Sequence, residues 1–327
     1  MMEFPTSPRT RGRSVLIGKL AVSGLLLALL FWRVDRPAFL RSLQTLPVGL
    51  FLGCVALYAL GYLISTIRWQ RLLRAEGIRL PLWRLGLVYI EGAFFNLFLP
   101  TLIGGDIVRG YFIYRMTRGN DASIASILVD RLSGFAALML IAVGSLAVTF
   151  RTLNDPQIAA SILGVAVLFA GLMLVLLNDR VKDLVLGLLR AAGLGRFQAK
   201  LQGLVDSLHR YRRHYRALGQ AFLLSILLQG LIIVTYYLIG VGLNLGVPLV
   251  YFFLFIPLTT VVAMLPVSVA GLGVREAGVV FFFAKVGVDA GAALGMSLVC
   301  FSLTLIVSGL GGVAFLLDHH AAKRDGN

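Results

Sequence analysis

The sequence has few charged residues and almost no cysteine. Only 14% of its 327 residues are charged and 58% are hydrophobic, whereas ordinary soluble domains have about 25% charged and about 45–50% apolar residues. Its two cysteines, Cys54 and Cys300, stand inside apolar runs, where a free thiol behaves as a small hydrophobic side chain. Neither a disulfide framework nor a water-soluble domain is therefore expected.

Motifs for metals, nucleotides and catalysis are also missing from the sequence. Its histidines do not combine with cysteines at the spacing of a zinc site, and it has no nucleotide loop or nucleophile elbow. We therefore expect no metal, no cofactor and no catalytic residue, and the protein is not expected to be an enzyme or an ATP-driven pump. The four histidines are His209, His214, His319 and His320.

The charge that is present is strongly positive, with 30 lysines and arginines against 15 acidic residues. The basic residues gather in short connections between apolar segments, which is typical of cytoplasmic loops lying against anionic lipid. This distribution favours the membrane surface, and not nucleic acid, as the partner of the positive charge.

Apolar runs of about 20 residues, long enough to cross roughly 30 Å of hydrocarbon as a helix, recur along the chain. We expect an all-α, polytopic membrane helical bundle that forms one membrane domain over residues 1–327. The first run has no small-residue cleavage site behind it, which indicates a retained span and not a signal peptide. The six expected full spans are 14–32, 48–67, 123–150, 157–177, 217–245 and 290–317.

Two further apolar regions, 83–115 and 249–286, are interrupted near their middle. The loops 68–84 and 178–216 are both basic, and both can be cytoplasmic only if 83–115 enters and leaves by the same membrane face. We therefore expect two oppositely oriented re-entrant broken helical hairpins. The interruptions are Pro100, Gly104, Gly105 and Asp106 in the first, and Pro266, Gly271, Gly273, Arg275 and Glu276 in the second.

The two hairpins share a sequence pattern. Residues 99–109 align without gaps to residues 265–275, with leucine, proline, glycine, valine and arginine at identical spacing. The pattern predicts an inverted repeat, whose first copy is 48–150 and whose second is 217–317. Inverted repeats with broken helices at matching positions point to a transport site inside the bilayer.

The segments outside the repeats are basic and are expected in the cytoplasm of a multi-pass plasma (inner) membrane protein. They are the N-terminus 1–13, the loop 178–216 and the tail 318–327, so both termini are expected to be cytoplasmic. Within the loop, 196–216 has the pattern of an interfacial amphipathic helix. The tryptophans near span ends are expected to form interfacial belts: Trp32, Trp69 and Trp83.

Charged side chains within apolar segments are candidate functional residues, because each costs about 2.5–3.5 kcal/mol to insert. Asp106 and Arg109 follow the Gly104-Gly105 break. With the free N–H groups of a helix start, they would suit a phosphate. Alternatively, Asp106 caps the helix or pairs with Arg109.

The second hairpin offers a similar candidate. Arg275 and Glu276 follow Gly271 and Gly273, so that Arg275 would contact an anionic head group and Glu276 would be its partner at the helix start. The alternative is a charge pair that locks the two hairpins together.

Three acidic or basic residues remain within the apolar segments of the first repeat. We expect Asp130 to pair with Arg109, leaving Arg131 for a ligand or for snorkelling to the membrane surface. Glu91, near Asn96, is either a proton-coupling carboxylate or a hydrogen-bonded anchor.

Several short motifs occur in a fixed order, and this set resembles the lysylphosphatidylglycerol synthase transmembrane-region family, also called flippase-like or UPF0104, from about residue 15 to 317. The resemblance implies a membrane region that moves lipid between leaflets. The chain ends soon after the last span, so the aminoacyl-transferase half found in some members is not expected. The motifs are Arg68-Trp69-Gln70-Arg71-Leu72-Leu73-Arg74, Phe95-Asn96-Leu97-Phe98-Leu99-Pro100, Gly104-Gly105-Asp106-Ile107-Val108-Arg109, Asp130-Arg131-Leu132, and Leu265-Pro266 with Gly271-Leu272-Gly273-Val274-Arg275-Glu276.

The sequence thus favours a flippase-like translocase for an anionic or modified phospholipid or a lipid carrier, with Arg109 and Arg275 at the head group and membrane lipids as partners. Two alternatives stay open. The protein could be a non-enzymatic membrane partner of a lipid- or glycan-modifying enzyme, or an intramembrane transferase.

Overall fold

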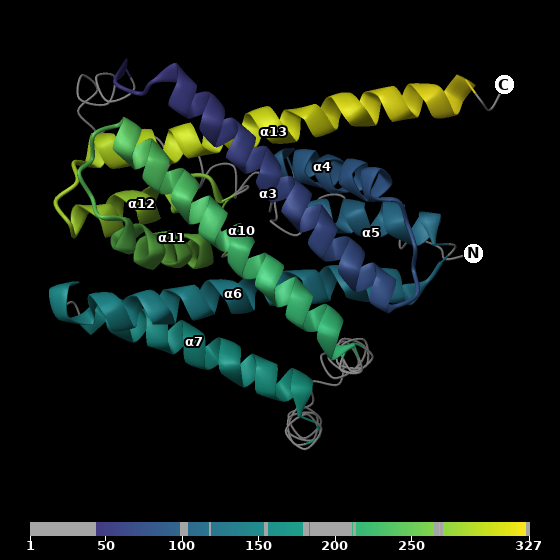
Figure 1. Cartoon of the computed structure of the whole chain (residues 1–327), viewed down its shortest axis with the longest axis horizontal. Helices are drawn as coiled ribbons and strands as arrows, with labels where there is room; N and C mark the ends of the chain where they lie inside the picture. Colours follow the sequence, from purple (N-terminus) through teal and green to yellow (C-terminus); the bar gives the residue numbers. More distant parts are fainter. Residues whose placement is uncertain are drawn as a thin grey trace, which may run out of the picture.

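The chain forms a helical bundle in which the described residues contain helices and no strands, which confirms the all-α prediction for this part of the chain (Figure 1). The computed structural model describes residues 44–98, 104–117, 119–153, 156–178, 183, 211, 214–264, 268 and 271–324. The helices are α3 (Val48–Ala75), α4 (Leu82–Phe98), α5 (Gly104–Met116), α6 (Asp121–Leu153), α7 (Pro156–Leu177), α10 (Tyr215–Gly242), α11 (Leu249–Ala263), α12 (Val274–Ala284) and α13 (Ala290–Arg324).

Four helices, α3, α6, α10 and α13, are long and apolar enough to cross a membrane. The 28 residues of α3 correspond to about 42 Å of helix, which exceeds a hydrocarbon core of about 30 Å. These helices coincide with four of the six expected spans, and α7 occupies a fifth. The remaining expected span, 14–32, lies outside the described residues, and so do residues 196–210, 212 and 213 of the expected interfacial helix.

Two boundaries differ from the prediction. Helix α3 runs on to Ala75, eight residues past the expected end at residue 67, so the basic loop begins later than the sequence indicates. Helix α13 runs on to Arg324, through most of the segment 318–327 that was predicted as a tail. In both cases the apolar run ends before the helix does, because a helix continues through basic residues that favour helical backbone.

The two interrupted regions each form a pair of short helices. Helices α4 and α5 have 17 and 13 residues, and α11 and α12 have 15 and 11. Each is about 16–26 Å long, less than the thickness of the hydrocarbon core. Within the connections between them, residues 99–103, 265–267, 269 and 270 lie outside the described residues.

Within each pair the chain folds back on itself. A Cβ atom at Gly105, near the start of α5, would lie 2.1 Å from the carbonyl oxygen of Gly92 on α4, and Ile113, farther along α5, packs with Leu85 in one buried cluster. In the second pair, Gly278 of α12 approaches Thr259 of α11. The helices of each pair are therefore antiparallel neighbours.

Helices α3 and α10 cross side by side in opposite directions at the front of the view in Figure 1. The start of α3 contacts the end of α10: a Cβ atom at Gly242 of α10 would lie 2.7 Å from the side chain of Leu50 on α3. The end of α3 meets the start of α10, where Arg71 donates a hydrogen bond to Gln220 over 2.8 Å.

The helix contacts have the same pattern in both halves of the chain. Helix α4 packs against α13, and its counterpart α11 packs against α6; α5 packs against α6, and its counterpart α12 packs against α13. If α3, α4, α5 and α6 are exchanged one for one with α10, α11, α12 and α13, the pairs of helices in contact among these eight stay the same.

Much of the outer surface is apolar. Val148, Leu168 and Leu223 are 72%, 75% and 67% exposed, which would be unfavourable in water over so many residues. Such a surface is the one expected where lipid hydrocarbon, and not water, surrounds the helices.

Glycines allow two of these helices to approach closely, as is common in membrane bundles. A Cβ atom at Gly311 of α13 would lie 2.2 Å from the carbonyl oxygen of Ile90 on α4, whereas nothing lies within 4 Å of a Cβ atom at Gly309 of the same helix.

We therefore expect Gly311→Ala to push α13 away from α4 and to lower stability by about 1–3 kcal/mol, as overpacking does. Gly309→Ala is the matched control and should melt no earlier than the unaltered protein. The measurement is the apparent melting temperature in detergent. Equal melting temperatures for the two variants would contradict this description of the α4–α13 contact.

Candidate functional site

A chain of ion pairs, buried except for the side chain of Arg131, joins helices α3, α5 and α6. At its centre is Asp130 of α6, which is fully buried. Its Oδ1 atom accepts a hydrogen bond from Nε of Arg68 on α3 over 2.7 Å, and its Oδ2 atom accepts one from Nη2 of Arg109 on α5 over 3.4 Å. The structure thus contains the expected Asp130–Arg109 pair and adds a shorter one to Arg68.

The chain of ion pairs continues through Asp106. Its Oδ1 atom accepts a hydrogen bond from Nη1 of Arg109 over 3.1 Å, and its Oδ2 atom accepts one from Nε of Arg131 over 2.6 Å. The five linked side chains, which we call the arginine cluster, are Arg68, Asp130, Arg109, Asp106 and Arg131. Three guanidinium groups and two carboxylates give the cluster a formal charge of +1.

Arg68 belongs to this cluster because of its position on α3. Arg68 and Trp69 face inward together with Leu72, whereas Arg71 and Arg74 are exposed on the opposite side. Residues 68–84 were predicted as a cytoplasmic loop and Trp69 as part of an interfacial belt. The loop prediction is wrong for these two residues, because the helix continues past its apolar run. Trp69 is buried within the protein and does not face the membrane interface.

Arg109 is held between two aromatic rings. Its Cζ atom lies 4.3 Å from the ring centre of Trp69 and 4.1 Å from that of Tyr89, distances at which a cation is attracted to the face of an aromatic ring. The indole of Trp69 is itself fixed by donating a hydrogen bond to Ser126 over 2.9 Å. The Nε atom of Arg109 is buried and has no hydrogen-bond partner among the described residues.

The start of α5 differs from the expected phosphate site. The backbone N–H of Gly105 donates a hydrogen bond to Oδ1 of Asn96 on α4 over 2.6 Å, and Gly104 is buried at the first position of the helix. The Gly105 amide is therefore occupied within the protein, and Asp106 is paired with two arginines. The positive charge that would attract an anion here is that of the arginine cluster, and not that of the helix start alone.

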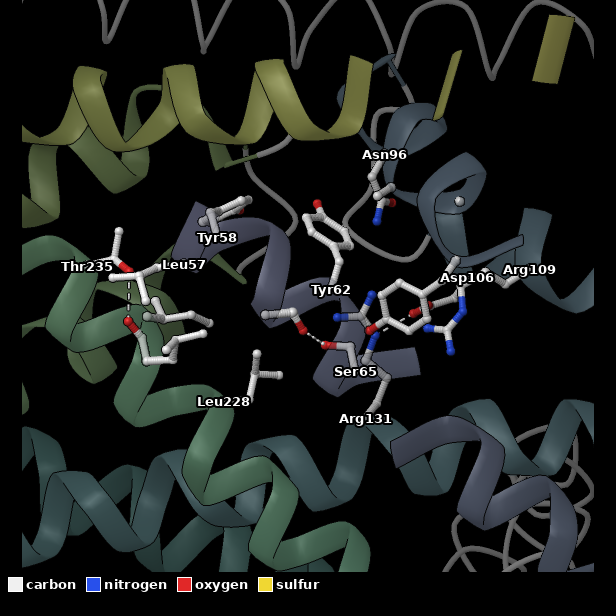
Figure 2. Close-up of a pocket in the computed structure, with 16 residues that line it drawn as sticks. Leu57, Tyr58, Tyr62, Ser65, Asn96, Asp106, Arg109, Arg131, Leu228 and Thr235 are labelled. Carbon is white, nitrogen blue, oxygen red and sulfur yellow. Dashed lines mark hydrogen bonds and ion pairs between the residues drawn. The ribbon is translucent and has the colours of Figure 1, made fainter. Parts of the chain in front are cut away.

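A cavity of about 270 Å³ adjoins the arginine cluster. Figure 2 shows Asp106, Arg109 and Arg131 at one end, Thr235 and Tyr58 at the other, and Tyr62 between them. Because pockets for whole small molecules are usually about 300–1,000 Å³, this cavity suits a small polar group better than a complete lipid.

Tyrosines connect the two ends of the cavity. The ring centres of Tyr58 and Tyr62 are 5.7 Å apart and those of Tyr62 and Tyr89 are 6.0 Å apart. The hydroxyl groups of Tyr58 and Tyr62 share hydrogen bonds with Thr304 and Ser308 of α13, over 2.8 and 2.9 Å. The cavity is therefore lined by tyrosine and threonine side chains as well as by apolar side chains such as Leu57 and Leu228.

The second hairpin has a different arrangement. Glu276 is fully buried and accepts hydrogen bonds from the backbone N–H of Gly273 over 2.6 Å and from Nε of Arg275 over 3.0 Å. The Cζ atom of Arg275 lies 4.7 Å from the ring centre of Phe301. Gly271 and Gly273 have φ angles of 73° and 82°, which only glycine adopts without strain. The charge pair thus lies within this hairpin and does not join it to the first.

The structure therefore separates the predicted site residues into two groups. The first group lies in or beside the arginine cluster and consists of Asn96, Asp106, Arg109, Asp130 and Arg131. The second group consists of Arg275 and Glu276, which do not line the cavity beside the arginine cluster. Glu91 is buried on α4 and also does not line it. Among the described residues, no group of three or more His, Cys, Asp or Glu side chains is placed to hold a metal ion.

Sequence reasoning missed Arg68, Tyr62 and Tyr89 as parts of the site. For Arg68 a signal was present, because Arg68, Trp69, Leu72 and Leu73 recur at the spacing of one helix face. For the two tyrosines no such signal exists, since tyrosine is common in membrane spans and only the packing of α3 against α4 brings these two together.

The chain belongs to the family described as the lysylphosphatidylglycerol synthase TM region, whose sequence profile matches residues 16–312. This confirms the predicted family. The chain is also similar to a UPF0104 membrane protein of Pyrococcus horikoshii, with 23% identity over 302 residues, which cover 84% of this chain and 88% of the relative. With its four apolar helices of spanning length, the protein is an integral membrane protein.

The cluster gives a prediction about stability. Asp130→Asn removes the charge that two buried arginines share, and breaking a buried ion pair from one side costs about 3–5 kcal/mol. The apparent melting temperature in detergent should fall clearly.

The control is Asp289→Asn, because Asp289 is exposed and accepts hydrogen bonds from the N–H groups at the start of α13, which an asparagine oxygen also does. If Asp130→Asn had the same apparent melting temperature as this control, Asp130 would not hold the cluster together.

Proposed function

We propose that this protein is a lipid translocase that moves an anionic phospholipid or lipid carrier between the leaflets of the plasma (inner) membrane. The observation that carries the proposal is the buried arginine cluster beside a polar cavity. Charged groups at membrane depth usually face a substrate pathway or a partner, and this cluster has more positive than negative charge. Membership of a family named for a lipid synthase agrees with a lipid as the substrate.

The proposal includes a topology. The pair α4–α5 enters and returns by the cytoplasmic face, and α11–α12 does so from outside, between six full spans with both termini in the cytoplasm. The short, antiparallel helices of each pair support this arrangement, as do the opposite directions of α3 and α10. Rocking of one repeat against the other would then expose the cavity to each face in turn.

The head group has a defined place in this proposal. Its phosphate binds to the free Nε donor of Arg109 and to Arg131, because charge-assisted hydrogen bonds from guanidinium groups to phosphate are the strong ones. The hydroxyl groups of Tyr62 and Tyr58 provide the next contacts along the cavity, toward Thr235. The protein catalyses no reaction, and a separate lipid-modifying enzyme supplies the lipid.

The test is lipid exchange in proteoliposomes with fluorescent phosphatidylglycerol, and with phosphatidylcholine as the zwitterionic comparison. We expect the protein to accelerate exchange of phosphatidylglycerol. Arg109→Gln should slow it by at least about tenfold, since a hydrogen bond to a charged group contributes about 1.5–3 kcal/mol and 1.4 kcal/mol is tenfold.

The matched control is Arg115→Gln, because Arg115 lies on the same helix but is exposed. It should leave exchange unchanged. Size-exclusion profiles and melting temperatures show whether each variant is folded. Exchange equal to that of empty vesicles would overturn the proposal, and so would equal exchange by folded Arg109→Gln and the unaltered protein.

A further inference from the structure

A second, larger cavity lies on the outside of the bundle between α5 and α6. This groove has a volume of about 720 Å³, and Met264 at the end of α11 borders it. Its walls are mostly apolar side chains, and several of them are exposed in the part of the chain that the structure describes: Ile107 is 68% exposed, Tyr111 54% and Ile124 49%. We call it the α5–α6 groove.

The groove and the polar cavity share two residues. Asp106 and Arg131 line both, and their side chains form the ion pair of 2.6 Å. The Arg131 side chain is 43% exposed, whereas that of Asp106 is only 8% exposed. The pair therefore stands at the boundary between the apolar groove and the polar cavity, with its positive member on the outer side.

We propose that the α5–α6 groove binds one acyl chain of an anionic phospholipid whose phosphate contacts Arg131, and that the Arg131–Asp106 pair opens to admit the head group to Arg109. The inference rests on the proposed function and names the route by which the lipid reaches the site. The occupant follows from the surroundings: α6 has the length and hydrophobicity of a membrane span, so hydrocarbon chains surround the groove. A cation at its inner end selects chains attached to a negative head group.

Opening this pair leaves neither member isolated. Asp106 keeps its hydrogen bond to Arg109 over 3.1 Å when Arg131 moves away, and the partly exposed Arg131 side chain can reach a phosphate at the surface. The lipid phosphate thus replaces the Asp106 carboxylate as the partner of Arg131. The buried Asp106 carboxylate remains paired with Arg109, so it is not left as an uncompensated charge. In the aligned segment of the second half, Leu272 takes the position of Asp106, so this pair exists in one half only.

Gly110 provides a sharp test, because it lines the groove and belongs to neither the arginine cluster nor the polar cavity. A Cβ atom there would lie 3.7 Å from Cδ1 of Ile127, an ordinary contact, so Gly110→Ala should leave the groove open. Gly110→Phe should fill it. Both variants are reconstituted into vesicles that contain phosphatidylglycerol with a photoactivatable acyl chain, or phosphatidylcholine with the same chain, and the labelled peptides are identified by mass spectrometry.

We expect phosphatidylglycerol to label α5 and α6 peptides around Ile107 and Ile124 more than phosphatidylcholine does, and Gly110→Phe to reduce that label several-fold while Gly110→Ala keeps it. Labelling of α7 around the exposed Leu168 serves as the reference for surrounding lipid and should be the same in every variant. Label on the groove that equals this reference, or that survives in folded Gly110→Phe, would overturn the inference.

Binding and exchange are read separately, so the two proposals fail in different ways. Specific groove labelling without lipid exchange would remove the translocase proposal and leave the groove as a lipid site. Lipid exchange that persists in Gly110→Phe, with no preference in labelling, would leave the translocase proposal and remove the groove as its route.

Discussion

The carboxylate of Asp130 holds two arginines from different helices in the interior of the helical bundle, and the site depends on this interaction. Arg68 comes from α3 and Arg109 from α5, and neither could remain charged in an apolar interior without a partner. By binding both, Asp130 fixes α3, α5 and α6 relative to one another. Arg109 is then positioned between Trp69 and Tyr89, and its buried Nε atom has no hydrogen-bond partner among the described residues.

The two halves share one set of helix contacts but differ in charge. In the first half, Arg109 is part of a cluster with a surplus of positive charge, and that cluster adjoins a cavity. In the second half, the aligned Arg275 is neutralised by the neighbouring Glu276, which also holds the start of α12 through Gly273. The first half therefore has a net positive charge beside a cavity, whereas the second half has an ion pair within its hairpin. This asymmetry favours Arg109 over Arg275 as the residue that meets an anion.

Several features of the site could be predicted from the sequence because they depend on local pattern. Four charged residues within apolar segments could be identified as site candidates: Asp106, Arg109, Asp130 and Arg131. Because inserting a charged side chain into lipid costs free energy, each was expected to contact an oppositely charged group or a ligand. The end of α3 could not be predicted from hydropathy, since Arg68 interrupts the apolar run while the helix continues. The spacing of Arg68, Trp69 and Leu72 is compatible with one helix face. The partners of Arg68, however, follow only from the packing of α3 against α6 and α10, where Arg68 also donates a hydrogen bond to Ser225 over 2.8 Å.

By itself, the sequence determined that the chain is a helical membrane protein, which segments form its long apolar helices, and which family it belongs to. Those properties follow from hydrophobicity and motif order along the chain, and they need no knowledge of neighbours. Only the tertiary structure decided that Asp130 pairs with Arg68 as well as Arg109, that Asn96 occupies the amide of Gly105, and that Asp106 and Arg131 separate a polar cavity from an apolar groove. Ion pairs of this kind join residues tens of positions apart, and their geometry is set by how whole helices cross.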